Sequence, residues 1–191
     1  MKPSPHIQTE LRLCAALLIE LEVAMTPSDF EEKWHRLLGH IERVWNKCQH
    51  HFGRSPKWSG WKGQYESQRR IDPLLSYLKN ARGAHEHTVA DITATKSGSI
   101  SISAGPSGRA YIKHLQVGVD GIKGEWDGDL AVTFEPGGVE LVPVTNRGKT
   151  YPVPTSHLNR PLEDISAITI GRYGLLYYEA LVAKAESHFI T

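Results

Sequence analysis

The spacing of apolar residues changes twice along this chain, and these changes constrain its fold more than any other feature. Up to Thr88 the apolar residues recur every three or four positions, as in amphipathic helices. From about Asp91 to Tyr151 they alternate with polar residues, which is the period of a half-buried strand. After Pro161 the helical spacing returns and continues to about His188. The pattern predicts an α+β protein: a helical bundle with an antiparallel β-sheet inserted before the last helix.

About four main helices are expected from the apolar stripes. We predict them at residues 9–25, 27–51, 72–88 and 162–188, with a short helix at 64–70 before the third. The stripe of the second is the longest: Phe30, Trp34, Leu37, Ile41, Trp45, Cys48 and Phe52. Because the last helix is apolar on most sides, we expect it to be well covered and to pack on the first three.

The β segment is expected to be an antiparallel meander. Strands are predicted at 99–103, 110–117, 130–134 and 139–144, with glycine-rich turns between them. A small acidic cluster, Asp120, Glu125, Asp127 and Asp129, lacks the ligand spacing of a calcium loop and is interpreted as a set of turns. We predict one domain over residues 1–191, with the bundle in 1–90 and 160–191 and the meander and its connector in 91–159.

Composition and charge exclude several classes of protein. The formal net charge is +1 with histidine neutral, so any RNA binding must come from a local patch. The two cysteines, Cys14 and Cys48, fall on apolar stripes and are interpreted as core thiols, which suits a reducing cytoplasm. The first residues lack the apolar core of a signal peptide, and no apolar run is long enough to span a membrane. We therefore expect a cytoplasmic protein with no membrane contact.

The predicted helix from Asp72 to Thr88 has an unusual second face. Asp72 is expected to cap the helix, and Pro73 suits the first helical position. The core-facing stripe contains Leu74, Leu78, Ala81 and His85. The second stripe is small and polar: Ser76, Asn80, Gly83 and His87. A solvated face would carry more Lys and Glu, so the second stripe predicts close approach of another backbone or a ligand.

The end of this helix, Leu-Lys-Asn-Ala-Arg-Gly-Ala-His-Glu-His, resembles the HEPN family, whose signature is an arginine, a spacer of four to six residues and a histidine. Here the signature falls on Arg82 and His87, and Gly83 departs from the polar residue that often follows the arginine. The resemblance implies a helical bundle, a homodimer with a composite active site, and metal-independent endoribonuclease activity. It also implies a toxin or phage-defence role, in some cases beside an antitoxin protein.

Metal-free cleavage of RNA needs a base for the 2′-hydroxyl, a cation for the phosphate and an acid for the leaving oxygen. His87 titrates near neutrality and could serve as base or acid. Arg82 could hold a phosphate with its planar fork, and Asn80 could hold the phosphate or orient His87. These three residues are the predicted catalytic set. Neither a cofactor nor a metal is expected.

A second region has the composition of a surface for single-stranded RNA. Trp58 lies between Lys57 and Lys62, and Arg69 and Arg70 follow. Aromatic rings flanked by cations provide stacking faces and phosphate contacts. The competing interpretation, which is favoured for the tryptophans, is that they close one end of the bundle.

Two further functions compete with the endoribonuclease. The alternative is a non-catalytic HEPN-like binding or structural module, in which Arg82 pairs with Glu86 and His87 contacts carbonyls at the helix end. A metal hydrolase built on His85 and His87 is disfavoured, because residues two apart on a helix point about 160° apart.

Overall fold

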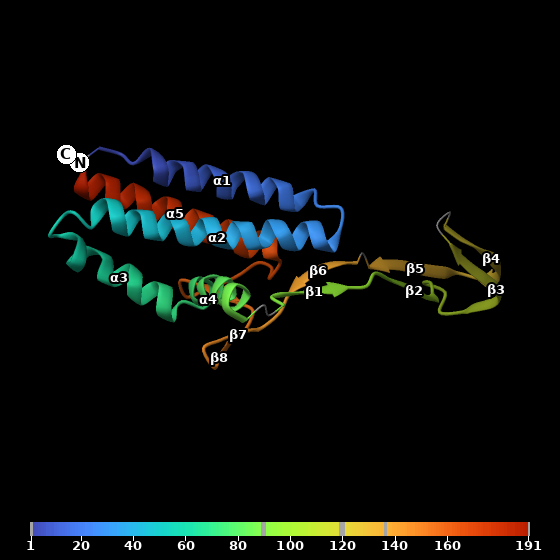
Figure 1. The fold of residues 1–191 in the computed structure, drawn as a ribbon. Coiled ribbons are helices and arrows are strands. Elements are labelled where there is room, and N and C mark those ends of the chain that lie inside the picture. The colour runs from blue at the N-terminus through green and yellow to red at the C-terminus, as the bar shows by residue number, and fades with distance from the viewer. Residues whose placement is uncertain (1, 89–90, 119–120, 136, 191) are drawn as a thin grey trace. The chain divides into compact units, whose positions relative to one another are not determined.

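The computed structural model describes residues 2–88, 91–118, 121–135 and 137–190, without the side chains of 85–88, 117, 122, 134 and 135. The fold is α+β, as predicted (Figure 1). The chain divides into two compact units, which are described separately. The helical unit comprises Met1–Ala94 and Val139–Thr191, and the β unit comprises Thr95–Gly138.

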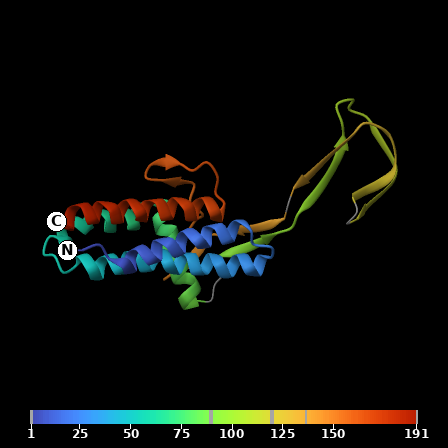
Figure 2. The ribbon, with the colours of Figure 1, turned by 90° about the horizontal axis from the view of Figure 1, so that it is seen from above.

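Five helices are found in the described part of the helical unit. They are α1 (Pro5–Glu22), α2 (Pro27–Phe52), α3 (Trp58–Ile71), α4 (Pro73–Thr88) and α5 (Ala167–Phe189). Helices α1, α2 and α5 run alongside one another, whereas α4 is seen nearly end-on in Figure 1 and crosses them in Figure 2. The predicted stripes form the core between these helices, and the stripe of α2 is buried from Trp34 to Phe52. Cys14 and Cys48 are buried free thiols, and burial raises the pKa of each to about 12.

Helix boundaries differ from prediction where caps or tertiary packing decide them. Helix α5 begins at Ala167 rather than 162, because Ser166 is the N-cap and accepts a hydrogen bond from the amide of Thr169. Helix α3 begins at Trp58 rather than 64, although a proline and three glycines in or beside residues 54–63 favour a loop from the sequence alone. The helical conformation places Trp58 and Trp61 on one face, where their rings stack 5.1 Å apart. Packing of these rings overrides the low helix propensity of glycine.

Two short hairpins belong to the helical unit. Strand β7 (Val144–Asn146) pairs with β8 (Lys149–Tyr151), and β9 (Ser156–His157) pairs with β10 (Arg160–Pro161). Residues 139–159, which the sequence pattern placed in the insertion, therefore pack with the helices. The second hairpin is fixed to the start of α4 through Asp72, whose carboxylate accepts hydrogen bonds from the amides of Leu75 and Leu158 and contacts Nδ1 of His157 at 2.9 Å.

The β unit is a set of nested pairs rather than the predicted meander. Strand β2 (Ser99–Ala104) pairs with β5 (Leu130–Glu135), and β3 (Ala110–Gly118) pairs with β4 (Gly121–Gly128). Strands β1 (Thr93–Lys96) and β6 (Gly138–Leu141), which pair with each other, contain the two points at which the chain passes from one unit to the other. Each of these described sheets has two strands.

The interpretation of the acidic cluster as turns is wrong for two of its members. Glu125 and Asp127 lie within β4, opposite His114 and Tyr111 of β3. A Cβ at Gly124 would meet the carbonyl oxygen of His114 at 2.2 Å. This glycine therefore permits a close approach of two strands, whereas the sequence alone suggested a turn.

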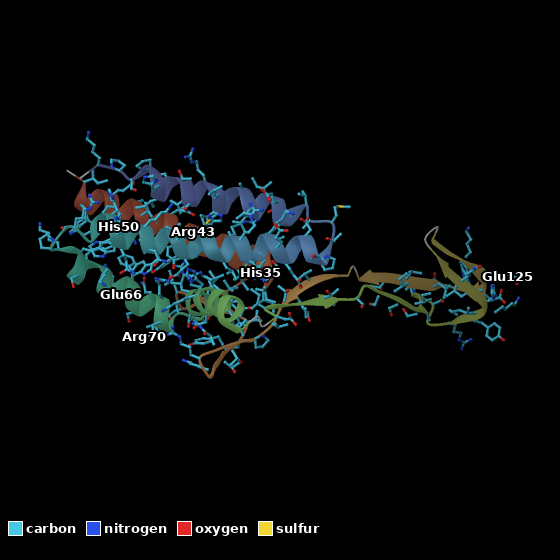
Figure 3. All side chains as sticks on the ribbon, in the orientation of Figure 1. His35, Arg43, His50, Glu66, Arg70 and Glu125 are labelled. Carbon is cyan, nitrogen blue, oxygen red and sulfur yellow. The ribbon has the colours of Figure 1, made fainter. Side chains whose placement is uncertain are left out.

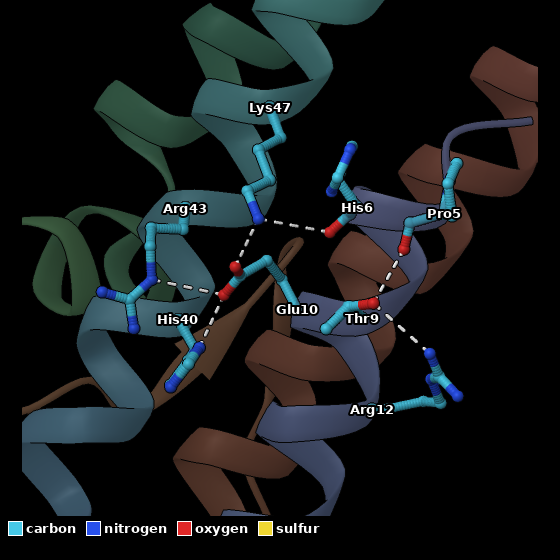
Figure 4. A network of polar contacts seen from close by, with 8 residues as sticks. All are labelled: Pro5, His6, Thr9, Glu10, Arg12, His40, Arg43 and Lys47. Carbon is cyan, nitrogen blue, oxygen red and sulfur yellow. Dashed lines mark hydrogen bonds and ion pairs between the residues drawn. The ribbon is translucent and has the colours of Figure 1, made fainter.

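Helices α1 and α2 are joined by a buried carboxylate with three basic neighbours (Figure 4). Glu10 of α1 contacts Lys47 at 2.5 Å, His40 at 2.6 Å and Arg43 at 3.2 Å, all on α2. Burial alone would raise the pKa of Glu10, but the contacts with Lys47, His40 and Arg43 lower it to about 2. The charged form of Glu10 therefore stabilises the packing of α1 on α2.

We predict that Glu10→Gln lowers the free energy of unfolding at pH 7 on the order of 2 kcal/mol, because it leaves the cations of α2 without their carboxylate. The pKa of Glu10 is lower in the folded state than its ordinary value of 4.5, so its contribution is complete above about pH 5. That contribution is lost as the pH falls from about 4.5 towards 2. Urea unfolding at several pH values should show the two proteins converging in acid. Glu20→Gln on the same helix is the control, and a constant difference across pH would contradict the assignment.

Candidate functional site

The small polar stripe of α4 is covered by strand β7 of the same chain. Asn146 donates from Nδ2 to Oδ1 of Asn80 at 3.0 Å, and Asn80 donates from its own Nδ2 to the carbonyl oxygen of Ser76 at 2.7 Å. A Cβ at Gly83 would meet Nδ2 of Asn146 at 2.5 Å, so a larger residue at position 83 would force the amide of Asn146 to move. The predicted close approach at this stripe is therefore made by a strand that was not predicted from the sequence.

The β7–β8 hairpin has a tight two-residue turn. Arg147 and Gly148 both have positive φ angles, 52° and 75°, which is the conformation of a type I′ turn. The strands pair from Val144 opposite Tyr151 to Asn146 opposite Lys149. At the base of the hairpin, Val144 is buried. The sequence Asn-Arg-Gly-Lys between two short runs of β-forming residues was the signal that could have predicted this turn.

A cavity of about 340 Å³ lies where α3, α4 and the β7–β8 hairpin meet. We call it the cationic pocket, after its six basic residues: Arg69, Arg70, Lys79, Arg82, Arg147 and Lys149. Among the described residues that line it, Glu42 is the one carboxylate. The cationic pocket is therefore a local positive patch of the kind that a chain of near-neutral net charge would need for binding polyanions.

Arg69, which the sequence predicts to bind RNA, is held by contacts within its own chain. Its guanidinium forms an ion pair with Glu42 and lies over the ring of Trp45, 4.5 Å from the centroid. Only 4% of the residue is exposed. Arg69 therefore neutralises the one carboxylate of the pocket's described lining.

Four of the remaining five cations are exposed side chains, namely Arg70, Lys79, Arg147 and Lys149. Arg70, labelled in Figure 3, lies in the last turn of α3. Lys79 comes from α4 and Lys149 from β8. Three separate elements therefore direct positive charge at one cavity, where a phosphate group would meet several donors at once.

The predicted catalytic residues divide into three cases. Arg82 is half-buried and lines the cationic pocket. Asn80 also lines it, and the oxygen and the nitrogen of its side-chain amide both form hydrogen bonds within the chain, one of which holds Asn146 of β7. The side chain of His87, like those of His85 and Glu86, lies outside the described residues.

The small polar stripe of Ser76, Asn80, Gly83 and His87 also predicts a homodimer whose twofold axis passes near it. In the structure the part of this stripe that contains Asn80 and Gly83 is covered by Asn146 of the same chain. A twofold contact through it would require the hairpin to leave.

The second predicted RNA surface does not form around Trp58. This residue is 4% exposed, and its ring stacks on Phe52 at 5.7 Å and lies 6.3 Å from the ring of Trp45. Both faces of the ring are covered by other rings, which favours the interpretation that the tryptophans close one end of the bundle over stacking on a base. Lys62 pairs with Glu66 one turn along α3, and Lys57 is exposed just before this helix.

Comparison of this chain with known protein families, with curated proteins and with solved structures finds no match. Across the described residues, no group of three or more His, Cys, Asp or Glu side chains is placed to hold a metal ion. None of the described helices combines the length and apolar character needed to cross a bilayer. The function must therefore be argued from the chemistry of the cationic pocket.

We predict that Trp58→Ala lowers the free energy of unfolding by about 3–5 kcal/mol, because it removes a buried aromatic ring and leaves a cavity. Lys57→Ala, the neighbouring exposed residue, should change it by less than about 0.5 kcal/mol. Urea denaturation followed by circular dichroism measures both. A Trp58→Ala protein as stable as the wild type would mean that the ring is free for a ligand after all.

Proposed function

We propose that this chain binds RNA in the cationic pocket and cleaves it as a metal-independent endoribonuclease of the HEPN type. The observation that carries the proposal is the location of Arg82, the arginine of the HEPN-like motif, in a cavity that it shares with four exposed cations. The one carboxylate among the described lining residues is paired with Arg69. Such a pocket favours a ligand with concentrated negative charge, and a phosphodiester provides it.

The proposed reaction is a transesterification at phosphorus. A nitrogen of His87 takes the proton of the 2′-hydroxyl, and the 2′-oxygen attacks the adjacent phosphorus. Arg82 holds the non-bridging oxygens as charge builds on them. The bond to the 5′-oxygen breaks, and that oxygen takes a proton from an acid. The products are a 2′,3′-cyclic phosphate and a 5′-hydroxyl.

The reaction needs both a general base and a general acid, and a homodimer would supply two copies of His87, one for each role. Because β7 covers α4 as far as Gly83, we propose that the second copy approaches the C-terminal turn of α4. A cytoplasmic toxin or defence role, with an antitoxin protein as partner, follows from the HEPN resemblance and forms part of the proposal.

The second candidate function is a HEPN-like module that binds RNA, or serves only as structure, without cleaving. The internal bonding of Asn80 favours it, because one of the three predicted catalytic residues is engaged in holding the hairpin. The two candidates differ in one measurable property, which is whether bound RNA is cut.

We predict that the purified protein cleaves mixed single-stranded RNA in the presence of a chelator. His87→Ala should reduce the rate by roughly 10²–10⁴-fold, the usual contribution of a general acid or base. Arg82→Lys should reduce it as well, because a point charge cannot reproduce the planar fork. Gel electrophoresis of end-labelled RNA gives the rates, and circular dichroism checks that each variant is folded.

His50→Ala and Arg36→Lys, both on α2 and outside the cationic pocket, are the matched controls and should keep full activity. Undiminished cleavage by the His87→Ala protein would overturn the endoribonuclease proposal. Binding of RNA without cleavage by the wild type would select the second candidate.

A further inference from the structure

The β7–β8 hairpin is attached to α4 close to its turn and carries charge at its tip. Asn146, the last residue before the turn, is fixed to α4 by its hydrogen bond to Asn80 and by its close approach to Gly83. The segment between β6 and β7, which leads into the hairpin, is fixed too, because the hydroxyl of Tyr77 donates to the carbonyl oxygen of Val142 at 2.8 Å. The tip, Arg147 to Lys149, is exposed. This arrangement holds charged side chains in place without burying them.

The residue at the first turn position is unusual for the turn type. Type I′ turns place both central residues at positive φ, where Asn, Asp and Gly are preferred. Here Arg147 occupies that position with a φ of 52°. Residues with a long side chain are disfavoured at positive φ, so backbone preference does not explain why an arginine stands at position 147. Its side chain lines the cationic pocket, which offers a reason for its presence.

Lys149 follows the turn and also lines the cationic pocket. Its Nζ lies over the ring of Tyr151, 5.1 Å from the centroid. This cation–π contact restricts a flexible side chain before any ligand binds. Neither Arg147 nor Lys149 belonged to the sites predicted from sequence.

We infer that the β7–β8 hairpin is a phosphate-binding element, in which Arg147 and Lys149 bind the backbone of single-stranded RNA opposite Lys79 and Arg82 of α4. Asn146 and Asn80 are its positioning residues. The choice of RNA as ligand rests on the proposed function, but the role of the hairpin does not depend on cleavage. A single strand is chosen because the cavity, at about 340 Å³, is at the small end of ligand sites and suits one nucleotide rather than a paired duplex.

The test measures binding with cleavage prevented. A fluorescent single-stranded RNA with 2′-O-methyl riboses, which lack the attacking hydroxyl, is titrated with the full chain and followed by anisotropy at several salt concentrations. The variants are Arg147→Asn, Lys149→Gln and the two combined. Lys184→Gln on α5, an exposed lysine outside the cationic pocket, is the matched control.

We expect the combined variant to bind at least roughly tenfold more weakly. The slope of log affinity against log salt should fall by about 0.7 for each phosphate that the variant no longer neutralises. Arg147→Asn should keep or raise the melting temperature, because asparagine suits positive φ better than arginine. Lower affinity with equal or higher stability separates a ligand-binding role from a structural one. Asn146→Ala should also weaken binding while the helical content is unchanged, because it releases the hairpin from Asn80.

Wild-type affinity and salt slope in the combined variant would overturn the inference, whether or not RNA is cleaved. Equal affinity for duplex and single-stranded RNA would overturn the choice of strand. Binding that depends on the hairpin, together with no cleavage of unmodified RNA by the wild type, would leave the inference standing and would reject the endoribonuclease proposal.

Discussion

The contact between α4 and strand β7 is the interaction on which the candidate site depends. It needs a small polar stripe on the helix: glycine at position 83 for space, and Asn80 as the acceptor for Asn146. Without this contact the cations of the hairpin would not share a cavity with those of α4. The sequence suggested that this helix face contacts a partner molecule. In the structure it contacts a distant segment of the same chain, since Asn146 lies 66 residues after Asn80.

The start of α4 is held by a second polar centre. Burial alone would raise the pKa of Asp72, but the hydrogen bonds from His157, Leu75 and Leu158 lower it below its ordinary value. One carboxylate thus caps the helix and fixes the β9–β10 hairpin. Both hairpins that follow the β unit, β7–β8 and β9–β10, are attached to α4. This helix therefore positions them within the helical unit. The site is therefore held by packing and hydrogen bonds rather than by the loop conformations alone.

Helical periodicity predicted the core well, since the stripes of α2 and α4 depend on local spacing that tertiary contacts do not change. Predictions based on residue type alone were less successful. Glycines near Trp58 suggested a loop, and Gly124 suggested a turn, yet the first stretch is helical and the second is a close strand contact. The HEPN-like motif pointed to Arg82 as a site residue, whereas Arg147 and Lys149 lie more than 60 residues further along the chain. Only the fold brings all three to one pocket, so no local sequence pattern could have predicted that they line it together.

The distribution of charge explains how a nearly neutral chain can hold a strongly positive cavity. Two carboxylates at the contacts between helices have partners within the chain. Glu10 contacts Lys47, Arg43 and His40 of α2, and Glu42 forms an ion pair with Arg69. At the cationic pocket, Glu42 is the one carboxylate of the described lining, and the buried Arg69 balances its charge. The other cations of the lining therefore keep their positive charge uncompensated by a carboxylate of the described lining. Placing Arg69 between Glu42 and the ring of Trp45 therefore does more than stabilise α3 on α2. The ion pair offsets the charge of Glu42 beside the exposed cations, so a net charge of +1 for the whole chain is compatible with a locally positive pocket.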